Sequence, residues 1–167
     1  MQIIIMRGVQ GSGKTTKAEK LLIRFYEEVE RLNIRRAVGE IFSTDDFFMV
    51  DGKYQFDPAK LPEAHAENLR NYTDAVILGH GLRTDTQEGL LIVDNTNLTI
   101  NEIAPYYQLA EAYGHQVKII TVRADPEICI ARNIHGVPEK TIRACHARML
   151  QHDQLMPPWW KHEVIGG

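Results

Sequence analysis

The sequence predicts an α/β fold in which a parallel β-sheet carries helices on both of its faces. Short apolar segments of strand length alternate along the chain with longer segments of helical period. A glycine-rich turn joins the first such strand to the first helix, and Gly or Pro residues bound most of the later helices. Residues 1–167 show no internal repeat and no linker, so they are expected to form one domain.

Four short segments rich in β-branched and apolar residues are predicted as strands. They are Gln2–Met6, Ala37–Ser43, Leu90–Asp94 and Gln116–Val122. The polar segment Thr84–Glu88, just before the third strand, is expected to be a surface loop. Ligands of such sheets bind beyond the carboxyl ends of the strands, so the segments that follow the first three strands are expected on one rim.

Helices are predicted between and after these strands. The first has an apolar stripe at helical spacing, the second lies between Pro58 and Gly79, and Gly114 closes the third. The last two are separated by the breaker Gly136-Val137-Pro138. The five predicted helices are Thr16–Leu32, Pro58–Gly79, Glu102–Tyr113, Pro126–Asn133 and Glu139–Gln151.

Residues 8–15 form a complete G-x-x-x-x-G-K-[ST] phosphate loop. Its glycines let backbone N–H groups turn toward a polyphosphate, Lys14 supplies a mobile cation, and Thr15 offers a hydroxyl to Mg²⁺. The strand before the loop and the helix after it bring the positive end of the helix dipole to the phosphates. Nucleotide binding is therefore predicted at Gly8, Gly11, Ser12, Gly13, Lys14, Thr15 and Thr16.

Two adjacent carboxylates, Asp45 and Asp46, follow the second predicted strand and are expected on the same rim as Lys14. A phosphoryl transferase needs a carboxylate there to take the proton of the acceptor hydroxyl. An aspartate in this position is equally able to cap the turn that follows. The phosphate loop nearby favours the catalytic role.

Asp94 ends the third predicted strand and is expected to hold Mg²⁺ together with Thr15. The residues after it are Asn95-Thr96-Asn97 rather than a glutamate that would activate water. This favours transfer of a phosphoryl group to an acceptor over hydrolysis.

The segment from Lys118 to Met149 is locally basic, with six Lys or Arg residues against three acidic ones. Arginines near the break between the last two helices are placed to neutralise charge on a transferring phosphoryl group. Arg132, beside that break, is the predicted residue, whereas Arg143 is expected on a solvated helix face.

The composition is that of an ordinary soluble protein, with a net charge of −3 and 25% charged residues. No apolar run is long enough for a membrane span and no signal-peptide pattern is present, so neither membrane contact nor secretion is expected. The two cysteines show no disulfide framework, which fits a reducing, cytoplasmic location. The oligomeric state stays open.

Several segments together resemble the short single-domain P-loop kinases related to phage polynucleotide 5′-kinase. The matching segments occur in the order Gly8–Thr16, Ser43–Phe48, Asp51–Pro58, Glu63–His65, Val93–Leu98 and Ala131–Pro138. The resemblance implies a P-loop NTPase of the adenylate-kinase-like type, with a mobile helical lid at about 132–140, Mg²⁺ and ATP as the donor pair, and a hydroxyl acceptor. By motif position it implies that Asp45 is the general base and Arg132 a lid arginine, with Lys14 and Thr15 as phosphate and metal ligands.

Two positions depart from the phage enzyme, and both concern the acceptor. Phe48 stands where that enzyme has an arginine three residues after the base, and Gly136 replaces a second lid arginine. Other polar residues near the rim are candidates for acceptor binding, although each also suits an ordinary capping or surface role: Asp46, His65, Asn68 and Asn97.

The predicted activity is transfer of the γ-phosphate of ATP to a hydroxyl of a nucleic acid, DNA or RNA, with a polynucleotide 5′-OH as the first choice. A hydroxymethyl-pyrimidine base in DNA and a small nucleoside remain alternative acceptors, and a nucleotide-dependent binding module is the alternative of another class. Residues 152–167 are expected to be a tail in which Trp159 and Trp160 dock on the domain or stack on bases.

Overall fold

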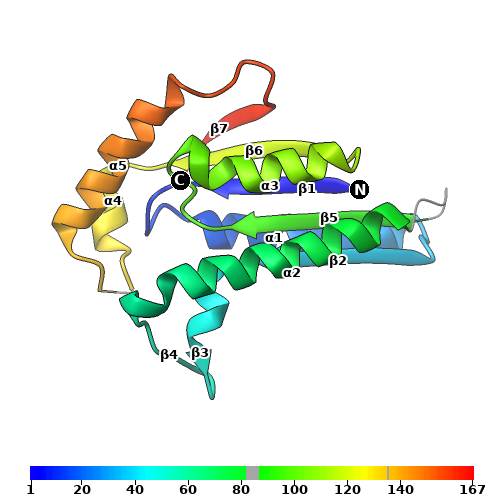
Figure 1. Cartoon of the computed structure of the whole chain (residues 1–167), viewed down its shortest axis with the longest axis horizontal. Helices are drawn as coiled ribbons and strands as arrows, with labels where there is room; N and C mark the ends of the chain where they lie inside the picture. The colour runs from blue at the N-terminus through cyan, green and yellow to red at the C-terminus, as the bar shows by residue number, and fades with distance from the viewer. Residues whose placement is uncertain (82–86, 135) are drawn as a thin grey trace.

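The computed structural model describes residues 1–81, 87–134 and 136–167 and confirms the α/β fold class. Its main sheet consists of five parallel strands in the order β2-β5-β1-β6-β7 (Figure 1). The strands are β1 (Gln2–Arg7), β2 (Arg36–Phe42), β5 (Gln87–Asp94), β6 (Gln116–Arg123) and β7 (His162–Gly166). The first strand of the chain therefore lies in the middle of the sheet.

The register of the strands explains why one rim collects the functional segments. Ile5 in β1 pairs with Val93 in β5 on one side and with Ile119 in β6 on the other. Phe42, the last residue of β2, also pairs with Val93. Because these strands are parallel and in step, the segments after β1, β2 and β5 emerge side by side, as expected for a ligand site in an open parallel sheet.

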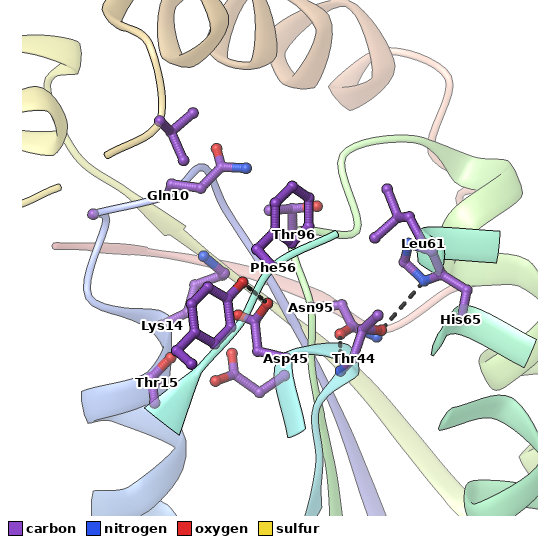
Figure 2. A pocket seen from close by; sticks show the side chains of 14 residues that line it. Gln10, Lys14, Thr15, Thr44, Asp45, Phe56, Leu61, His65, Asn95 and Thr96 are labelled. Carbon is purple, nitrogen blue, oxygen red and sulfur yellow. Dashed lines mark hydrogen bonds between the residues drawn. The ribbon is translucent and has the colours of Figure 1, made fainter. Parts of the chain in front are cut away.

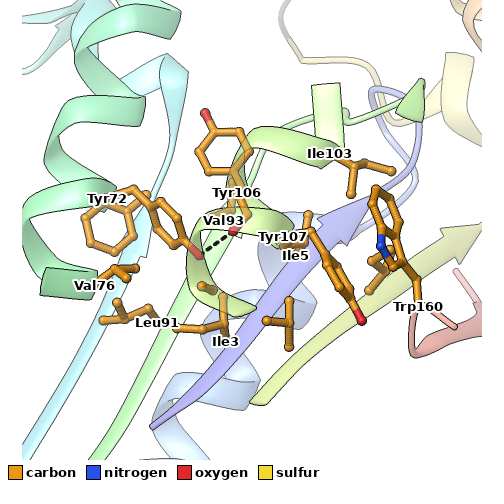
Figure 3. Close-up of a cluster of buried hydrophobic side chains, with 14 residues drawn as sticks. Ile3, Ile5, Tyr72, Val76, Leu91, Val93, Ile103, Tyr106, Tyr107 and Trp160 are labelled. Atoms are coloured by element: carbon orange, nitrogen blue, oxygen red, sulfur yellow. Dashed lines mark hydrogen bonds between the residues drawn. The ribbon is translucent and has the colours of Figure 1, made fainter. Parts of the chain in front are cut away.

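Helices cover both faces of the sheet, and successive side chains of β1 point to opposite faces. Ile3 and Ile5 pack in a buried cluster with side chains of α2 (Leu61–Gly81) and α3 (Ile100–Ala112), which Figure 3 shows. Ile4 and Met6 point to the opposite face, which α1 (Lys14–Arg31) covers through Ala18, Leu21 and Phe25. A strand buried on both faces reads as a continuous apolar run, which is the pattern that predicted it.

Two further helices, α4 (Pro126–Ala131) and α5 (Glu139–Asp153), lie beyond the carboxyl ends of the strands (Figure 1). They pack on the phosphate loop and on Leu98 through a buried cluster that includes Val9, Cys129 and Met149. The lid predicted at about 132–140 spans the connection between these helices, since α4 ends at Ala131 and α5 begins at Glu139. Asn133 holds this loop by hydrogen bonds with both backbone groups of Val137.

The C-terminal segment is not a tail. Helix α5 continues to Asp153, and β7 adds a parallel strand to the edge of the sheet. Trp160 docks on the domain, with its ring stacked on Tyr107 at 4.4 Å between centroids, whereas Trp159 is 73% exposed. Figure 3 shows Trp160 at one end of the core cluster.

The segment between β2 and α2 contains structure that the sequence pattern did not predict. A 3-10 helix, η1 (Thr44–Phe48), leads into a small hairpin of β3 (Met49–Val50) and β4 (Lys53–Tyr54), and a second, η2 (Pro58–Lys60), precedes α2. Asp51 and Gly52 form the hairpin turn with φ of 51° and 73°, the left-handed pair that a tight hairpin requires.

The polar loop expected at Thr84–Glu88 is also corrected in part. Gln87 and Glu88 already belong to β5, paired with Arg36 and Ala37 of β2. Residues 84–86 lie outside the described residues. Among the helices that the structure describes, none is long and apolar enough to span a bilayer.

Candidate active site

The phosphate loop connects the end of β1 to the start of α1 and is held by its surroundings. Gly8 N–H donates to the carbonyl of Thr96 at 3.0 Å. Gly11 has φ of 76°, and a Cβ there would lie 2.2 Å from the carbonyl oxygen of Cys129, so only glycine fits. Gly13, with φ of 92°, begins α1 without a side-chain cap, which leaves the first N–H groups of the helix available to an anion.

Lys14 lies beneath the loop with 9% of its surface exposed. Its Nζ donates to the carbonyl of Val9 at 2.9 Å. Burial lowers the pKa of Lys14, and the charges of Asp94 and Asp45 oppose that effect. A bound polyphosphate would favour the charged form of this amine in the same way, by placing negative charge beside it.

Asp94 and Thr15 meet at the expected metal position. Asp94 is 6% exposed, and burial raises its pKa, while the hydrogen bond with Thr15 and the charge of Lys14 lower it. Among the residues that the structure describes, its Oδ1 has no hydrogen-bond partner, and neither has Oγ of the buried Ser12. Buried polar atoms are normally satisfied, so these two fit a site completed by a metal ion and phosphate oxygens.

The chemistry of the pair suits Mg²⁺, which takes oxygen ligands and keeps bound waters and substrate phosphates in its shell. Within the described ranges no group of three or more His, Cys, Asp or Glu residues could hold a metal ion. Thr15 and Asp94 would therefore share the ion with the nucleotide.

A cavity of about 290 Å³ opens between the loop and the η1–hairpin segment. Gln10, Lys14 and Thr15 line one side of it, and Thr44, Leu61 and His65 line the other (Figure 2). Asp45 lies between the two sides. The cavity thus brings the predicted cation, the predicted metal ligands and the predicted base into one space.

Asp45 does not cap the turn that contains it. Ser43 is the N-cap of η1, and its hydroxyl accepts from the N–H of Asp45 at 3.3 Å. The Asp45 side chain is exposed to the cavity, and its Oδ1 accepts a hydrogen bond of 3.0 Å from the Tyr54 hydroxyl (Figure 2). Burial and the neighbouring Asp45 charge raise the pKa of Tyr54 to about 12, so this hydroxyl remains a donor at neutral pH.

Two polar contacts link residues on the far side of the cavity. Thr44 N–H donates to Oδ1 of Asn95 at 2.9 Å, and the Thr44 hydroxyl lies 3.2 Å from Nδ1 of His65. Figure 2 shows both contacts. His65 thus lines the cavity as expected, but Thr44 and Asn95, which position it, were not predicted.

Several of the predicted residues do not line this cavity. Asp46 borders a separate hollow with Glu67 and Asn68, where burial raises its pKa. Asn97 is buried, and its Nδ2 donates to the Met6 carbonyl at 2.8 Å, so it fixes the end of β1. Thr16 is exposed on α1, beyond the cavity lining.

Arg132 also does not line the cavity and is the exposed C-cap of α4. Its charge is close enough to Cys129 to act on the pKa of that thiol, and Cys129 touches the loop at Gly11. Arg143 instead pairs with Glu139 and Glu127 on the helix surface, as predicted.

Tyr54 and Phe56 are the main lining residues that sequence reasoning missed. A signal was present, since Asp51-Gly52 is a strong hairpin turn and two aromatic residues follow at strand spacing. Phe48 is 2% exposed and packs against both rings. It is a buried residue of η1 that supports the two rings.

A family profile described as an AAA domain matches residues 3–152 of the chain. NEDD4-binding protein 2 of Homo sapiens is 34% identical over 158 residues, which cover 91% of this chain and 8% of that protein. YLP motif-containing protein 1 of Mus musculus is 28% identical over 166 residues, 93% of this chain and 11% of that protein. The chain therefore spans about a tenth of the length of these relatives.

Two solved structures share the fold. Kti12 of Chaetomium thermophilum in complex with ADP-AlF3 aligns with a TM-score of 0.59 at 17% identity, covering 98% of this chain and 88% of that one. The APS kinase of Mycobacterium tuberculosis in complex with AMPPNP and APS aligns with a TM-score of 0.52 at 19% identity, covering 86% and 73%. Both are P-loop folds with a parallel sheet, as found for this chain.

Proposed function

The chain belongs to the AAA domain family, with a P-loop kinase-like domain, and on that premise we propose that it transfers the γ-phosphate of ATP to a hydroxyl of a nucleic acid. The acceptor we favour is the 5′-OH of a polynucleotide end. The observation that carries the proposal is the single cavity that Lys14 and Asp45 line together. A phosphate cradle and a solvent-accessible carboxylate in one space are what transfer to an alcohol requires.

The donor side holds the nucleotide. The loop N–H groups and Lys14 bind the β- and γ-phosphates, and Thr15 and Asp94 hold Mg²⁺, which supplies charge neutralisation at the phosphate oxygens. Arg132 adds a second cation at the edge of the loop. Its place at the end of α4, beside the residue that touches Gly11, supports this role.

The acceptor side carries the base. Asp45 accepts the proton of the acceptor hydroxyl as the hydroxyl oxygen attacks the γ-phosphorus. ADP leaves with the electrons of the broken P–O bond. Oδ1 is engaged by Tyr54, so Oδ2 is the oxygen that takes the proton. The two neighbours solved with AMPPNP and with ADP-AlF3 support a nucleotide as the ligand of the loop.

An acceptor screen with ATP labelled at the γ-phosphate tests the proposal. The acceptors are DNA and RNA oligonucleotides with a 5′-OH, DNA that contains hydroxymethyl-pyrimidine, and free nucleosides. Lys14→Ala should abolish labelling, whereas Lys17→Ala, two residues beyond the motif on α1, should keep it. Labelling of internal bases alone would replace the 5′-OH by a base acceptor. Tight ATP binding without labelling of any acceptor would favour a nucleotide-dependent binding module.

A further inference from the structure

Two aromatic rings beside the hairpin that follows η1 line the cavity. Tyr54 ends β4, and Phe56 follows two residues later, just beyond the hairpin. Their ring planes are 10° apart, with centroids separated by 6.4 Å. Phe56 is 52% exposed although it is large and apolar, which marks a surface available to a ligand.

The orientation of these rings is fixed from behind. Phe48 is buried and packs edge-on against Tyr54 at 6.2 Å and against Phe56 at 5.0 Å between centroids. Phe47 packs on Phe48 in turn, at 5.3 Å. A rigid aromatic surface of this kind contributes contact area to a ligand at a low cost in conformational entropy.

The position of the rings relative to the proposed chemistry identifies what they can bind. The Tyr54 hydroxyl contacts Asp45, so the aromatic pair lies directly beside the proposed base. Figure 2 shows Phe56 between the loop residue Gln10 and the opposite side formed by Leu61 and His65. A nucleoside whose sugar carries the attacking hydroxyl would therefore have an apolar ring beside its planar base, in a cavity that the polar residues His65 and Thr44 also line.

We propose that Phe56 stacks on the nucleobase next to the acceptor hydroxyl, while Tyr54 positions the Asp45 carboxylate that faces this hydroxyl. This inference rests on the proposed function, because it assigns the acceptor subsite of the same cavity. Stacking tolerates any base, since every base offers a π-face.

Steady-state kinetics on 5′-OH oligonucleotides with and without a base at the terminal nucleotide test the inference. Phe56→Ala should raise the KM for the normal acceptor about 5-fold to 150-fold, the range that base stacking contributes, and leave the KM for ATP unchanged. On the abasic acceptor the variant and the wild type should have the same KM. On the normal acceptor, the KM of Phe56→Leu should lie between those of the wild type and Phe56→Ala. Met49→Ala, which changes an exposed residue of the hairpin, should have the wild-type KM.

A binding assay separates this inference from the proposed function. An oligonucleotide with 2-aminopurine as its 5′-terminal base should lose fluorescence on binding the wild type but not on binding Phe56→Ala. If the wild type quenches the fluorescence yet labels no acceptor, the kinase proposal fails and the subsite stands. Equal quenching by both proteins, equal KM changes on normal and abasic acceptors, or no binding at all would overturn the subsite.

Discussion

The hydroxyl of Tyr54 donates a hydrogen bond of 3.0 Å to Oδ1 of Asp45, which ties the hairpin to the carboxylate at the centre of the cavity. The two residues come from different elements, β4 and η1, and Phe48 packs behind the tyrosine ring. The contact keeps one carboxylate oxygen occupied and the other directed at the cavity. Tyr54 is therefore a positioning residue in the proposed reaction.

Tyr54→Phe should lower kcat about 10-fold with little change in the KM for ATP or for the acceptor. The variant keeps the ring and removes only the hydrogen bond to a charged group, which contributes about 1.5 kcal/mol at such a site. Steady-state kinetics with both substrates varied measure the effect. Tyr26→Phe is the matched control, because its hydroxyl bonds to Gly39 far from the cavity. A change in KM alone, with kcat intact, would contradict the positioning role.

A buried arginine connects α5 to the strand that precedes the phosphate loop. Arg7 is 0% exposed, pairs with Asp153, and donates to the carbonyl oxygens of Leu98 and Met149 at 3.1 and 2.6 Å. Removing one partner of a buried pair costs about 3–5 kcal/mol, because the other is left uncompensated, whereas exposed pairs contribute less than about 1 kcal/mol.

Arg7→Met should therefore lower the free energy of unfolding by about 3 kcal/mol, since Asp153 retains partial solvent access and its contact with Arg123. Arg143→Met, which breaks only exposed pairs with Glu139 and Glu127, should change it by less than about 1 kcal/mol. Urea unfolding of the two variants measures the difference. Equal unfolding midpoints for Arg7→Met and the wild type would contradict the stabilising role of Arg7.

His162 at the start of β7 makes the stability of the sheet edge depend on pH. Its Nε2 lies 2.7 Å from the Thr121 hydroxyl, and burial lowers its pKa, as do the charges of Arg7 and Arg123, while Asp153 opposes them. The unfolded chain therefore binds a proton more readily than the folded one. The stabilisation is complete above the unfolded pKa of about 6.5 and is lost as the pH falls below it.

His162→Gln should reduce the difference in unfolding free energy between pH 7.5 and pH 5.5, because the group whose pKa is lowered by folding is removed. Chemical unfolding at the two pH values measures this difference. Val164→Ala, at an exposed position of the same strand, should keep the wild-type difference. An unchanged pH dependence in His162→Gln would show that another group is responsible.

Local sequence was sufficient for the sheet centre and for the donor side. The phosphate loop has a fixed spacing, and β1 and β6 are buried on both faces, so their apolar runs predict strands to within one residue. Asp94 ends β5 as predicted. These features depend on neighbours in the chain.

The remaining features depend on contacts between residues that are distant in sequence. Strand β7 has only two apolar residues, Val164 and Ile165, side by side, and is defined by its pairing with β6. The acceptor side needs the hairpin to fold back so that Tyr54 reaches Asp45. Arg7 resembles a surface cation in the sequence and is buried only because α5 brings Asp153 to it across 146 positions.

The central claim is that Asp45 is the base of a phosphoryl transfer from ATP. The direct measurement compares the wild type with Asp45→Asn for transfer of labelled γ-phosphate to a 5′-OH oligonucleotide, with ATP binding measured in parallel. The account predicts a loss of transfer of at least about 100-fold, the contribution of a general base, with ATP affinity within about 3-fold of wild type. Transfer at the wild-type rate by Asp45→Asn would contradict it.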